Sequence, residues 1–315
     1  MKLAFIIDPL ATLKPYKDSS FAMMQAALQR GHAVSVLEVG DLYVRDARVM
    51  ARSQALTIDE TKSPWWQLGD AVEAPPSTFD FVLMRKDPPF DIEYVISTYM
   101  LELAQQQGAR ILNDPHAVRN HNEKFAITRF AAYTVPTLIT RDIPRIRAFL
   151  DELGEIVVKP LDAMGGSGIF KLRRGEANVN AICETLSESG TRTLMAQRFI
   201  AEIGAGDKRV LVIDGEVMPY ALARIPAADD FRGNLAAGAR GQAQPLTDRE
   251  REIAEALAPT LKAEGLFIVG LDVIGGYLTE VNVTSPTGMR EIAAQTDCDP
   301  AARVIDALEA RLRAA

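Results

Sequence analysis

Gly270-Leu-Asp272-Val-Ile-Gly-Gly-Tyr-Leu-Thr-Glu280-Val-Asn282 is the stretch that decides how the C-terminal half of the chain folds. Two apolar runs flank a pair of glycines, which predicts a β-hairpin. Glu280 and Asn282 are two positions apart, so they share one face of their strand. Asp272 joins that face if the loop has an odd number of residues. A three-residue loop at 274–276, with Gly276 in the left-handed conformation, meets this condition.

Asp, Glu and Asn oxygens gathered on one strand face are hard ligands. They suit a magnesium ion that bridges the phosphates of a substrate. A solvated hairpin face with ordinary acidic residues is the alternative at this point. The strongly apolar residues around the three oxygen-bearing side chains favour the metal site.

Lys159 ends an apolar strand, expected at 155–159, just before a glycine-rich turn at 165–168. A lysine there can reach a phosphate, and glycines let backbone N–H groups approach the same oxygens. A plain β-hairpin with a lysine that extends to solvent explains the pattern equally well. Lys124 opens an expected helix, where the helix dipole does not favour positive charge. Taken alone, this position is typical of a surface lysine.

Strands alternate with helices in the first part of the chain. Strands are expected at 2–7, 32–39, 81–84 and 110–112, with helices at 18–30 and 94–107. This order predicts a small parallel α/β domain over roughly residues 1–120. Beyond 159, strands are expected at 193–199, 208–213 and 217–223, then a helix at 248–264 and the final hairpin at 266–283.

The segment 225–241 contains three glycines and has neither a helical nor a strand period. It is expected to be a mobile lid over the reactants, because Arg232, Asn234 and Arg240 in it can grip anions. A solvent-exposed connection is the alternative for this segment.

Composition and charge exclude several classes of protein. The 315 residues favour about two domains, and 48% hydrophobic with 24% charged residues is ordinary for a soluble globular protein. The net charge is −7 and no basic run occurs, so no nucleic-acid partner is expected. Cys183 and Cys298 lie far apart, which predicts neither a disulfide framework nor a zinc ribbon. The apolar run at 3–7 is too short for a signal peptide, and no stretch approaches a membrane span. A cytoplasmic protein is expected.

Familiar catalytic motifs are missing from the sequence: it contains no P-loop, no G-x-G-x-x-G, no H-E-x-x-H and no G-x-S-x-G. Arginines, however, recur at strand ends and in the glycine-containing loop: Arg85, Arg209, Arg224, Arg232 and Arg240. In an acidic protein this placement indicates an anionic substrate, a carboxylate or a phosphate. For Arg209, a structural ion pair with a neighbour such as Asp207 is the alternative.

In their order along the chain, these motifs resemble the ATP-grasp ligases and, from end to end, the bacterial glutathione synthetases. Met84-Arg-Lys-Asp-Pro-Pro-Phe-Asp91 and Arg232-Gly-Asn-Leu-Ala-Ala-Gly238 are far more specific than the general ATP-grasp pattern. Further matching blocks lie at 17–23, 159–166, 195–200, 206–215, 222–226 and 271–286.

This resemblance implies an α/β domain at 1–122, a central ATP-grasp lid subdomain at 123–200 and a C-terminal ATP-grasp subdomain at 201–315, with ATP held between two antiparallel sheets. It also implies a reaction. ATP phosphorylates the cysteinyl carboxylate of γ-glutamylcysteine, and the amine of glycine then attacks the acyl phosphate to give glutathione, ADP and phosphate. Such an enzyme positions groups and stabilises charge, so it needs no nucleophilic side chain.

The resemblance also assigns roles to individual residues. Arg209, Arg224 and Lys159 are the expected catalytic residues, which stabilise the transferring phosphoryl group. The expected ATP contacts are Lys124, Lys159, Gly165, Gly166, Ser167, Gln197, Arg198, Phe199, Ile200 and Asp207, the last at the ribose. The expected substrate contacts are Arg85, Asp18, Ser19, Arg232, Asn234 and Arg240. Asp272, Glu280 and Asn282 are expected to hold Mg²⁺, with Mn²⁺ as an alternative. A homotetramer is what the resemblance implies for assembly.

Two other functions stay open at this point. One is a different ATP-grasp ligase, such as a peptide or D-alanine ligase, against which only the substrate blocks weigh. The other is a non-catalytic nucleotide-binding or regulatory protein on the same scaffold. The complete charged set of Lys159, Asp272, Glu280 and Asn282 weighs against it.

Overall fold

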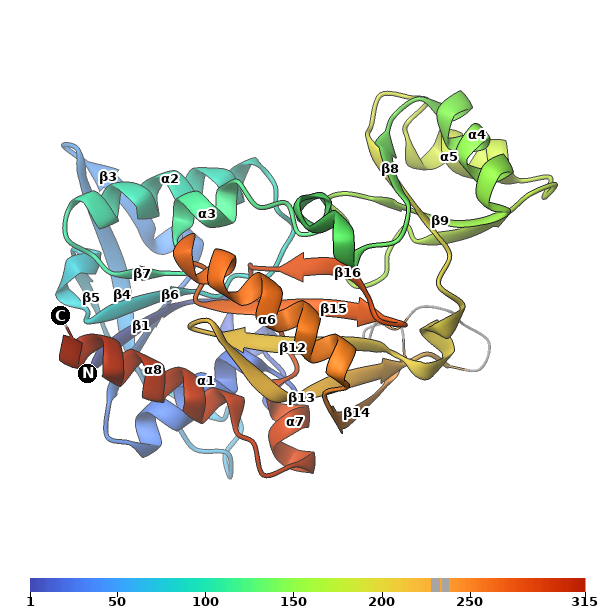
Figure 1. Ribbon diagram of the computed structural model, residues 1–315. Coiled ribbons are helices and arrows are strands. Elements are labelled where there is room, and N and C mark those ends of the chain that lie inside the picture. Colours follow the sequence, from blue (N-terminus) through green and yellow to red (C-terminus); the bar gives the residue numbers. More distant parts are fainter. Residues whose placement is uncertain (228–232, 234–237, 315) are drawn as a thin grey trace.

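The computed structural model describes residues 1–227, 233 and 238–314. Three sheets organise this part of the chain (Figure 1). The N-terminal sheet lies on the left of the view, the C-terminal sheet in the middle, and the central sheet projects away at the upper right. None of the helices in the described ranges is both long and apolar enough to cross a membrane.

The N-terminal sheet is built on the expected strands. β1 (Lys2–Ile6), β2 (Ala33–Leu37), β6 (Phe81–Met84) and β7 (Ile111–Leu112) run parallel. Helices α1 (Ser19–Gln29) and α2 (Ile92–Gln106) connect them, and the side chains of Asp18 and Asp91 cap their N-termini. The two expected helices are therefore confirmed. The shorter elements of this half are η1 (Leu10–Thr12), η2 (Val39–Asp41), η3 (Pro76–Thr78) and α3 (Pro115–Arg119).

The parallel strands are joined by three antiparallel strands that were not predicted from the sequence. β3 (Leu42–Arg45), β4 (Arg48–Ile58) and β5 (Trp66–Ala74) extend the sheet on the β2 side in antiparallel fashion. These strands lack a continuous apolar run, because β4 alternates between buried and exposed side chains and most of β5 is exposed. Antiparallel strands can face water on one side, so they carry a weaker hydrophobic signal than buried parallel strands.

The central sheet is antiparallel and has the order β10-β9-β11-β8. It consists of β8 (Thr137–Thr140), β9 (Glu155–Pro160), β10 (Phe170–Arg173) and β11 (Leu194–Arg198). Helices α4 (Ile143–Leu153) and α5 (Val179–Leu186) cover it and share a hydrophobic core with it, separate from the rest of the protein. The expected strands at 155–159 and 193–199 are confirmed.

The C-terminal sheet is also antiparallel, with the order β14-β13-β12-β15-β16. Its strands are β12 (Asp207–Ile213), β13 (Glu216–Ile225), β14 (Arg240–Pro245), β15 (Ile268–Ile274) and β16 (Tyr277–Asn282). The helices of this half are η4 (Phe125–Tyr133), η5 (Ala201–Ala205), α6 (Asp248–Ala263), α7 (Met289–Gln295) and α8 (Pro300–Ala314). α7 and α8 pack against α1, which brings both ends of the chain together (Figure 1).

The final hairpin keeps Asp272 and Glu280 on one face, although not for the expected reason. Its loop is the two-residue turn Gly275-Gly276, with φ values of 56° and 79°, rather than a three-residue loop. Asp272 lies opposite Glu280, while Val273 lies opposite Leu278. Thr279 is thus a β-bulge, and this extra residue restores the parity that the loop does not supply.

The ends of the expected mobile loop are strands. Ile225 is the last residue of β13 and pairs with Arg240, the first residue of β14. Arg232 and Asn234 lie outside the described residues, so the lid expected at 225–241 stays a prediction.

One buried side chain joins the N-terminal sheet to the C-terminal sheet. Asn113, directly after β7, donates to the carbonyls of Ile268 and Val283. Its amide oxygen accepts from the N–H groups of Phe267 and Ile268. Every hydrogen-bonding capacity of this amide is used. Asn113 therefore fixes the final hairpin to the N-terminal domain.

Candidate active site

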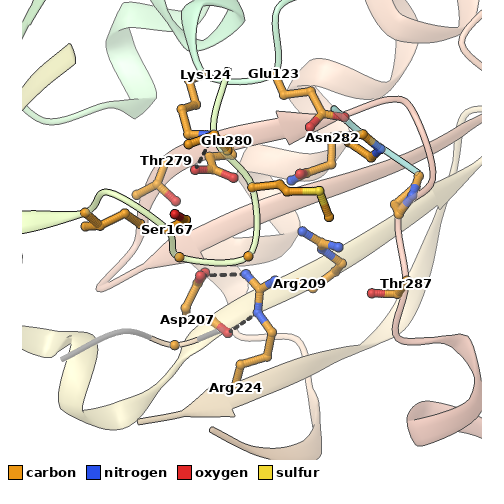
Figure 2. Close-up of a pocket in the computed structure, with 18 of the residues that line it drawn as sticks. Glu123, Lys124, Ser167, Asp207, Arg209, Arg224, Thr279, Glu280, Asn282 and Thr287 are labelled. Atoms are coloured by element: carbon orange, nitrogen blue, oxygen red, sulfur yellow. Dashed lines mark hydrogen bonds and ion pairs between the residues drawn. The ribbon is translucent and has the colours of Figure 1, made fainter. Parts of the chain in front are cut away.

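A cavity of about 590 Å³ lies where the three sheets approach one another. Asp18 reaches it from the N-terminal domain, Lys159 from the central sheet, and Arg209 and Glu280 from the C-terminal sheet. Figure 2 shows side chains from separate segments, such as Ser167, Arg209 and Glu280, around one space. Convergent charged groups from several elements around a concave space are typical of a ligand site.

Asp272 is the most heavily bound acidic side chain at the site. It is only 2% exposed and lies beneath the cavity lining. Its Oδ1 accepts from Nε of Arg209 at 2.8 Å, and its Oδ2 accepts from Nη2 of Arg209 at 2.8 Å. Nη2 of Arg224 lies 2.8 Å from the same Oδ2, and Nδ2 of Asn282 is 3.1 Å from it. Burial opposes the charge of Asp272, but the two guanidinium groups hold its pKa well below the usual range.

Glu280 forms a second, similar group with two lysines. Its Oε1 lies 3.4 Å from Nζ of Lys159 and 3.7 Å from Nζ of Lys124. Lys159 is 5% exposed and Lys124 6%. Burial lowers the pKa of Lys159, although Glu280 partly opposes this. Burial disfavours the charge of Glu280, and the two lysines nevertheless keep its pKa below the usual value.

Asp207 and Arg224 connect the two groups. Nη2 of Arg224 donates to Oδ2 of Asp207 at 2.5 Å, as Figure 2 shows. Oδ1 of Asp207 is buried and has no hydrogen-bond partner among the described residues. Burial raises the pKa of Asp207, and the negative charges of Asp272 and Glu280 raise it further. Arg224 opposes this shift but does not cancel it. An orphaned buried oxygen that lines the cavity is a place where a ligand hydroxyl can donate.

The expected nucleotide-side residues are brought together. The glycine turn lines the cavity through Gly165, Gly166 and Ser167, with φ values of 64° and 83° at the glycines. Nζ of Lys124 donates to the carbonyl of Ala163, 2.5 Å away, at the start of this turn. The cavity is also lined by Gln197, Arg198, Phe199 and Ile200, at the end of β11 and in the segment that follows it.

The expected substrate-side residues are only partly brought together. Asp18 lines the cavity. Arg85 is buried but is not part of the lining; its Nε donates to Ser20 Oγ at 3.2 Å and its Nη2 to the carbonyl of Pro286 at 2.9 Å. Ser19 is also buried away from the lining and accepts from the N–H of Met289. Arg240 is exposed on β14 and bonds Gln242. Arg85 and Ser19 join the N-terminal domain to residues 286–289.

Several lining residues were not singled out from the sequence. They are Asp8, Lys17, Asp87, Glu123, Thr284, Ser285, Thr287 and Glu291. Thr284 and Ser285 directly follow Asn282, and Glu123 directly precedes Lys124. Polar residues next to a predicted ligand strand were the available signal. Asp87 lies in the block 84–91 that carries the resemblance. Asp8 and Glu291 carried no such signal, because only the fold brings them to the cavity.

The donor set at Glu280 and Asn282 fits a divalent cation held together with phosphates. Nδ2 of Asn282 is used by Asp272 and by the carbonyl of Gly270, which leaves the amide oxygen for another partner. Within the described ranges no three His, Cys, Asp or Glu side chains form a metal-binding group on their own. Oxygen donors suit Mg²⁺, which keeps waters and substrate phosphates as its other ligands. The four surrounding cations disfavour a bare metal ion and favour one that arrives with an anion.

Comparison with known proteins shows the family of the chain. Residues 1–119 match the N-terminal domain of prokaryotic glutathione synthetase, and residues 123–297 match its ATP-grasp domain. The glutathione synthetase of Bordetella pertussis is 58% identical over 301 residues, covering 94% of this chain and 95% of that protein. That of Nitrosomonas europaea is 54% identical over 312 residues, covering 98% of each.

Solved structures share the fold at much lower identity. The D-cycloserine synthetase DcsG has a TM-score of 0.68 at 18% identity, covering 99% of this chain and all of that one. D-alanyl-alanine synthetase A from Vibrio cholerae has a TM-score of 0.62 at 16% identity, covering 100% and 98%. These likenesses confirm the ATP-grasp architecture expected from the motifs. With its two domain matches and relatives near 58% identity, the chain belongs to the prokaryotic glutathione synthetase family.

Proposed function

We propose that this protein is an ATP-dependent carboxylate–amine ligase that joins γ-glutamylcysteine to glycine and thereby makes glutathione. The observation that carries the proposal is the pairing of four buried cations with two carboxylates, one that lines the cavity and one directly beneath its lining. Lys124 and Lys159 contact Glu280, while Arg209 and Arg224 contact Asp272. Charges of both signs are thus in place for an anionic nucleotide and its cation.

Lys124 and Lys159 are placed to bind ATP phosphates. Both ammonium groups lie within 3.7 Å of Glu280 Oε1, and the glycine turn of Gly165 and Gly166 lines the same cavity. Phosphate oxygens take the place of the carboxylate on each lysine, and backbone N–H groups of the turn approach the same oxygens. Glu280 and Asn282, with Asp272 beneath them, then hold the cation; bound Mg²⁺ neutralises charge on the phosphates.

Arg209 and Arg224 are placed to stabilise the group that is transferred. A carboxylate oxygen of γ-glutamylcysteine attacks the γ-phosphorus, the bond to ADP breaks, and an acyl phosphate forms. Planar guanidinium groups suit phosphoryl oxygens because they offer two parallel donors. The glycine amine then attacks the acyl carbon, loses a proton, and inorganic phosphate leaves. Each arginine is at most 7% exposed, so water competes little with these contacts.

The adenosine is proposed to bind at the wall formed by 197–200, with Asp207 near the ribose. Oδ1 of Asp207 supports this, because it has no hydrogen-bond partner within 1–227, 233 and 238–314 and can accept from a ribose hydroxyl. Nζ of Lys171 lies 3.5 Å from the ring centroid of Phe199, which keeps that aromatic wall in place.

The remaining parts of the proposal come from the sequence and from the resemblance. They are the division into 1–122, 123–200 and 201–315, a substrate-binding role for Asp18, Mg²⁺ with Mn²⁺ as a substitute, and a homotetramer in the cytoplasm. Sedimentation analysis measures the assembly, and metal substitution in the assay measures the preference for the cation.

A substrate panel tests the proposed function. The protein is incubated with ATP, Mg²⁺ and pairs of amine and carboxylate substrates, and products are identified by mass spectrometry. Glutathione should form from γ-glutamylcysteine and glycine, and D-alanine should give little or no dipeptide. A D-alanine product that exceeds glutathione would support the other ligase, the activity that the fold likeness alone would suggest. No product from any pair would support a non-catalytic protein.

A further inference from the structure

β16 is an edge strand, yet it carries two of the side chains proposed to hold the cation. Among the described residues, the sheet order β14-β13-β12-β15-β16 gives it a single strand neighbour. Its pairing with β15 is interrupted by the bulge at Thr279, next to Glu280. An edge strand with a bulge has few backbone restraints on its outer side. The placement of Glu280 and Asn282 therefore needs restraint from elsewhere.

One residue supplies acceptors along this outer edge. The carbonyl of Glu123 accepts from the N–H of Val281 at 2.9 Å. Its Oε1 accepts from the N–H of Val283 at 2.8 Å, the N–H of Thr284 at 3.1 Å and Oγ1 of Thr284 at 2.9 Å. These bonds lie on both sides of Asn282. Glu123 acts as a short substitute for the missing neighbouring strand.

The same residue is joined directly to Lys124. Nζ of Lys124 lies 3.7 Å from Oε1 of Glu280 and donates to the carbonyl of Ala163 in the glycine turn. Figure 2 shows Glu123 beside Asn282 and Lys124 beside Glu280. The dipeptide 123–124 thus spans the ligand strand and the turn that is proposed to cover the phosphates.

We propose that Glu123 is a positioning residue that sets the affinity for the metal–nucleotide complex by fixing β16 relative to Lys124. This inference rests on the proposed function only in that the protein binds ATP and Mg²⁺. It assigns the effect to an acceptor oxygen at a fixed place, and not to the negative charge of the carboxylate. A glutamine keeps an oxygen there, whereas an aspartate keeps the charge but is one methylene too short.

The substitutions Glu123→Gln, Glu123→Asp and Glu123→Ala separate the two explanations. Binding of Mn²⁺ is measured by electron paramagnetic resonance in the presence of a non-hydrolysable ATP analogue, so no turnover is needed. Loss of the hydrogen bonds that Oε1 accepts predicts about a tenfold rise in the Mn²⁺ dissociation constant for the aspartate and alanine variants. The glutamine variant should stay within about threefold of the wild type.

Amide hydrogen exchange is the second readout. Residues 281–284 should exchange faster in the aspartate and alanine variants but not in the glutamine variant, because only the glutamine preserves the acceptor. Glu264→Gln is the matched control, since Glu264 accepts from Arg129 and does not line the cavity. It should change neither Mn²⁺ binding nor exchange at 281–284.

Two outcomes would overturn the proposal. One is an aspartate variant that binds Mn²⁺ like the wild type while the glutamine variant does not, which would assign the effect to charge. The other is unchanged Mn²⁺ binding in the aspartate and alanine variants. If the alanine variant does not fold, the aspartate and glutamine variants decide. Because the readout uses no dipeptide or amino acid, failure to make glutathione would leave the test of Glu123 intact.

Discussion

Asp272→Asn removes the charge that two buried arginines share and keeps the shape of the side chain. Arg209 loses a bidentate partner with both contacts at 2.8 Å, and Arg224 loses one contact at 2.8 Å. The amide NH₂ of asparagine would face an N–H donor. Removing one partner of a buried ion pair costs about 3–5 kcal/mol, because it leaves an uncompensated buried charge. We expect the free energy of unfolding to fall by about this amount.

Urea denaturation of the wild type and the variant measures the loss. Asp306→Asn is the matched control: Asp306 bonds Arg30 at 2.6 Å on the surface, with its side chain 48% exposed. That change should cost about 0–1 kcal/mol. Sulfate should stabilise the Asp272 variant more than the wild type, because the released guanidinium groups can bind an oxyanion, and sodium chloride at equal ionic strength controls for screening. A variant as stable as the Asp306 control, with no added response to sulfate, would refute the reasoning.

Lys159→Ala should raise the KM for ATP and lower kcat, so that kcat/KM falls about 10- to 100-fold. Lys159→Arg should restore kcat/KM only in part. Unchanged ATP kinetics in the alanine variant would show that Lys159 does not contact ATP. Glu280→Gln should lower activity at limiting Mg²⁺ by at least about tenfold, while the far-ultraviolet circular dichroism spectrum stays unchanged. Normal activity of this variant at limiting Mg²⁺ would contradict a role of Glu280 in metal binding. Burial lowers the pKa of His121 to about 4 in the folded protein, although Glu264 opposes this shift. In the unfolded chain His121 has its ordinary pKa of about 6.5, so the unfolded chain binds a proton at a higher pH than the folded protein does. As the pH falls from 6.5 to 4, His121 should lower the free energy of unfolding by up to about 3 kcal/mol. His121→Gln should reduce this pH dependence when the free energy of unfolding is measured by urea denaturation. An equally steep pH dependence in the variant would show that His121 is not the cause.

Buried strands and capped helices could be predicted from the sequence because their signals are local. Phe81–Met84 is an unbroken apolar run, and Asp18 is a strong N-cap for α1. Both were found at or near their observed bounds. Strands β3 to β5 were missed because their exposed faces dilute the hydrophobic period. Their pairing depends on tertiary contacts, which local sequence patterns do not reveal.

The site could be predicted where a short motif carries it and not where the tertiary fold builds it. The shared face of Asp272 and Glu280 was predicted from a three-residue loop that the structure does not have, and the bulge at Thr279 that produces this face has no sequence signal. Arg85 has the same local setting as an arginine at a ligand site. The structure instead turns it toward Ser20 and Pro286, and residue 286 is remote in sequence. Long-range partners of this kind are invisible to pattern and spacing.

In the proposed reaction, ATP activates a carboxylate of γ-glutamylcysteine, and isotope labelling follows this step. The cysteinyl carboxylate is labelled with ¹⁸O, and the inorganic phosphate released during glutathione formation is analysed by mass spectrometry. An acyl phosphate transfers one labelled oxygen to phosphate, because the carboxylate oxygen leaves with the phosphoryl group when glycine attacks. We predict one ¹⁸O in each phosphate. Glutathione formed with unlabelled phosphate, or phosphate release without γ-glutamylcysteine and glycine, would contradict the account.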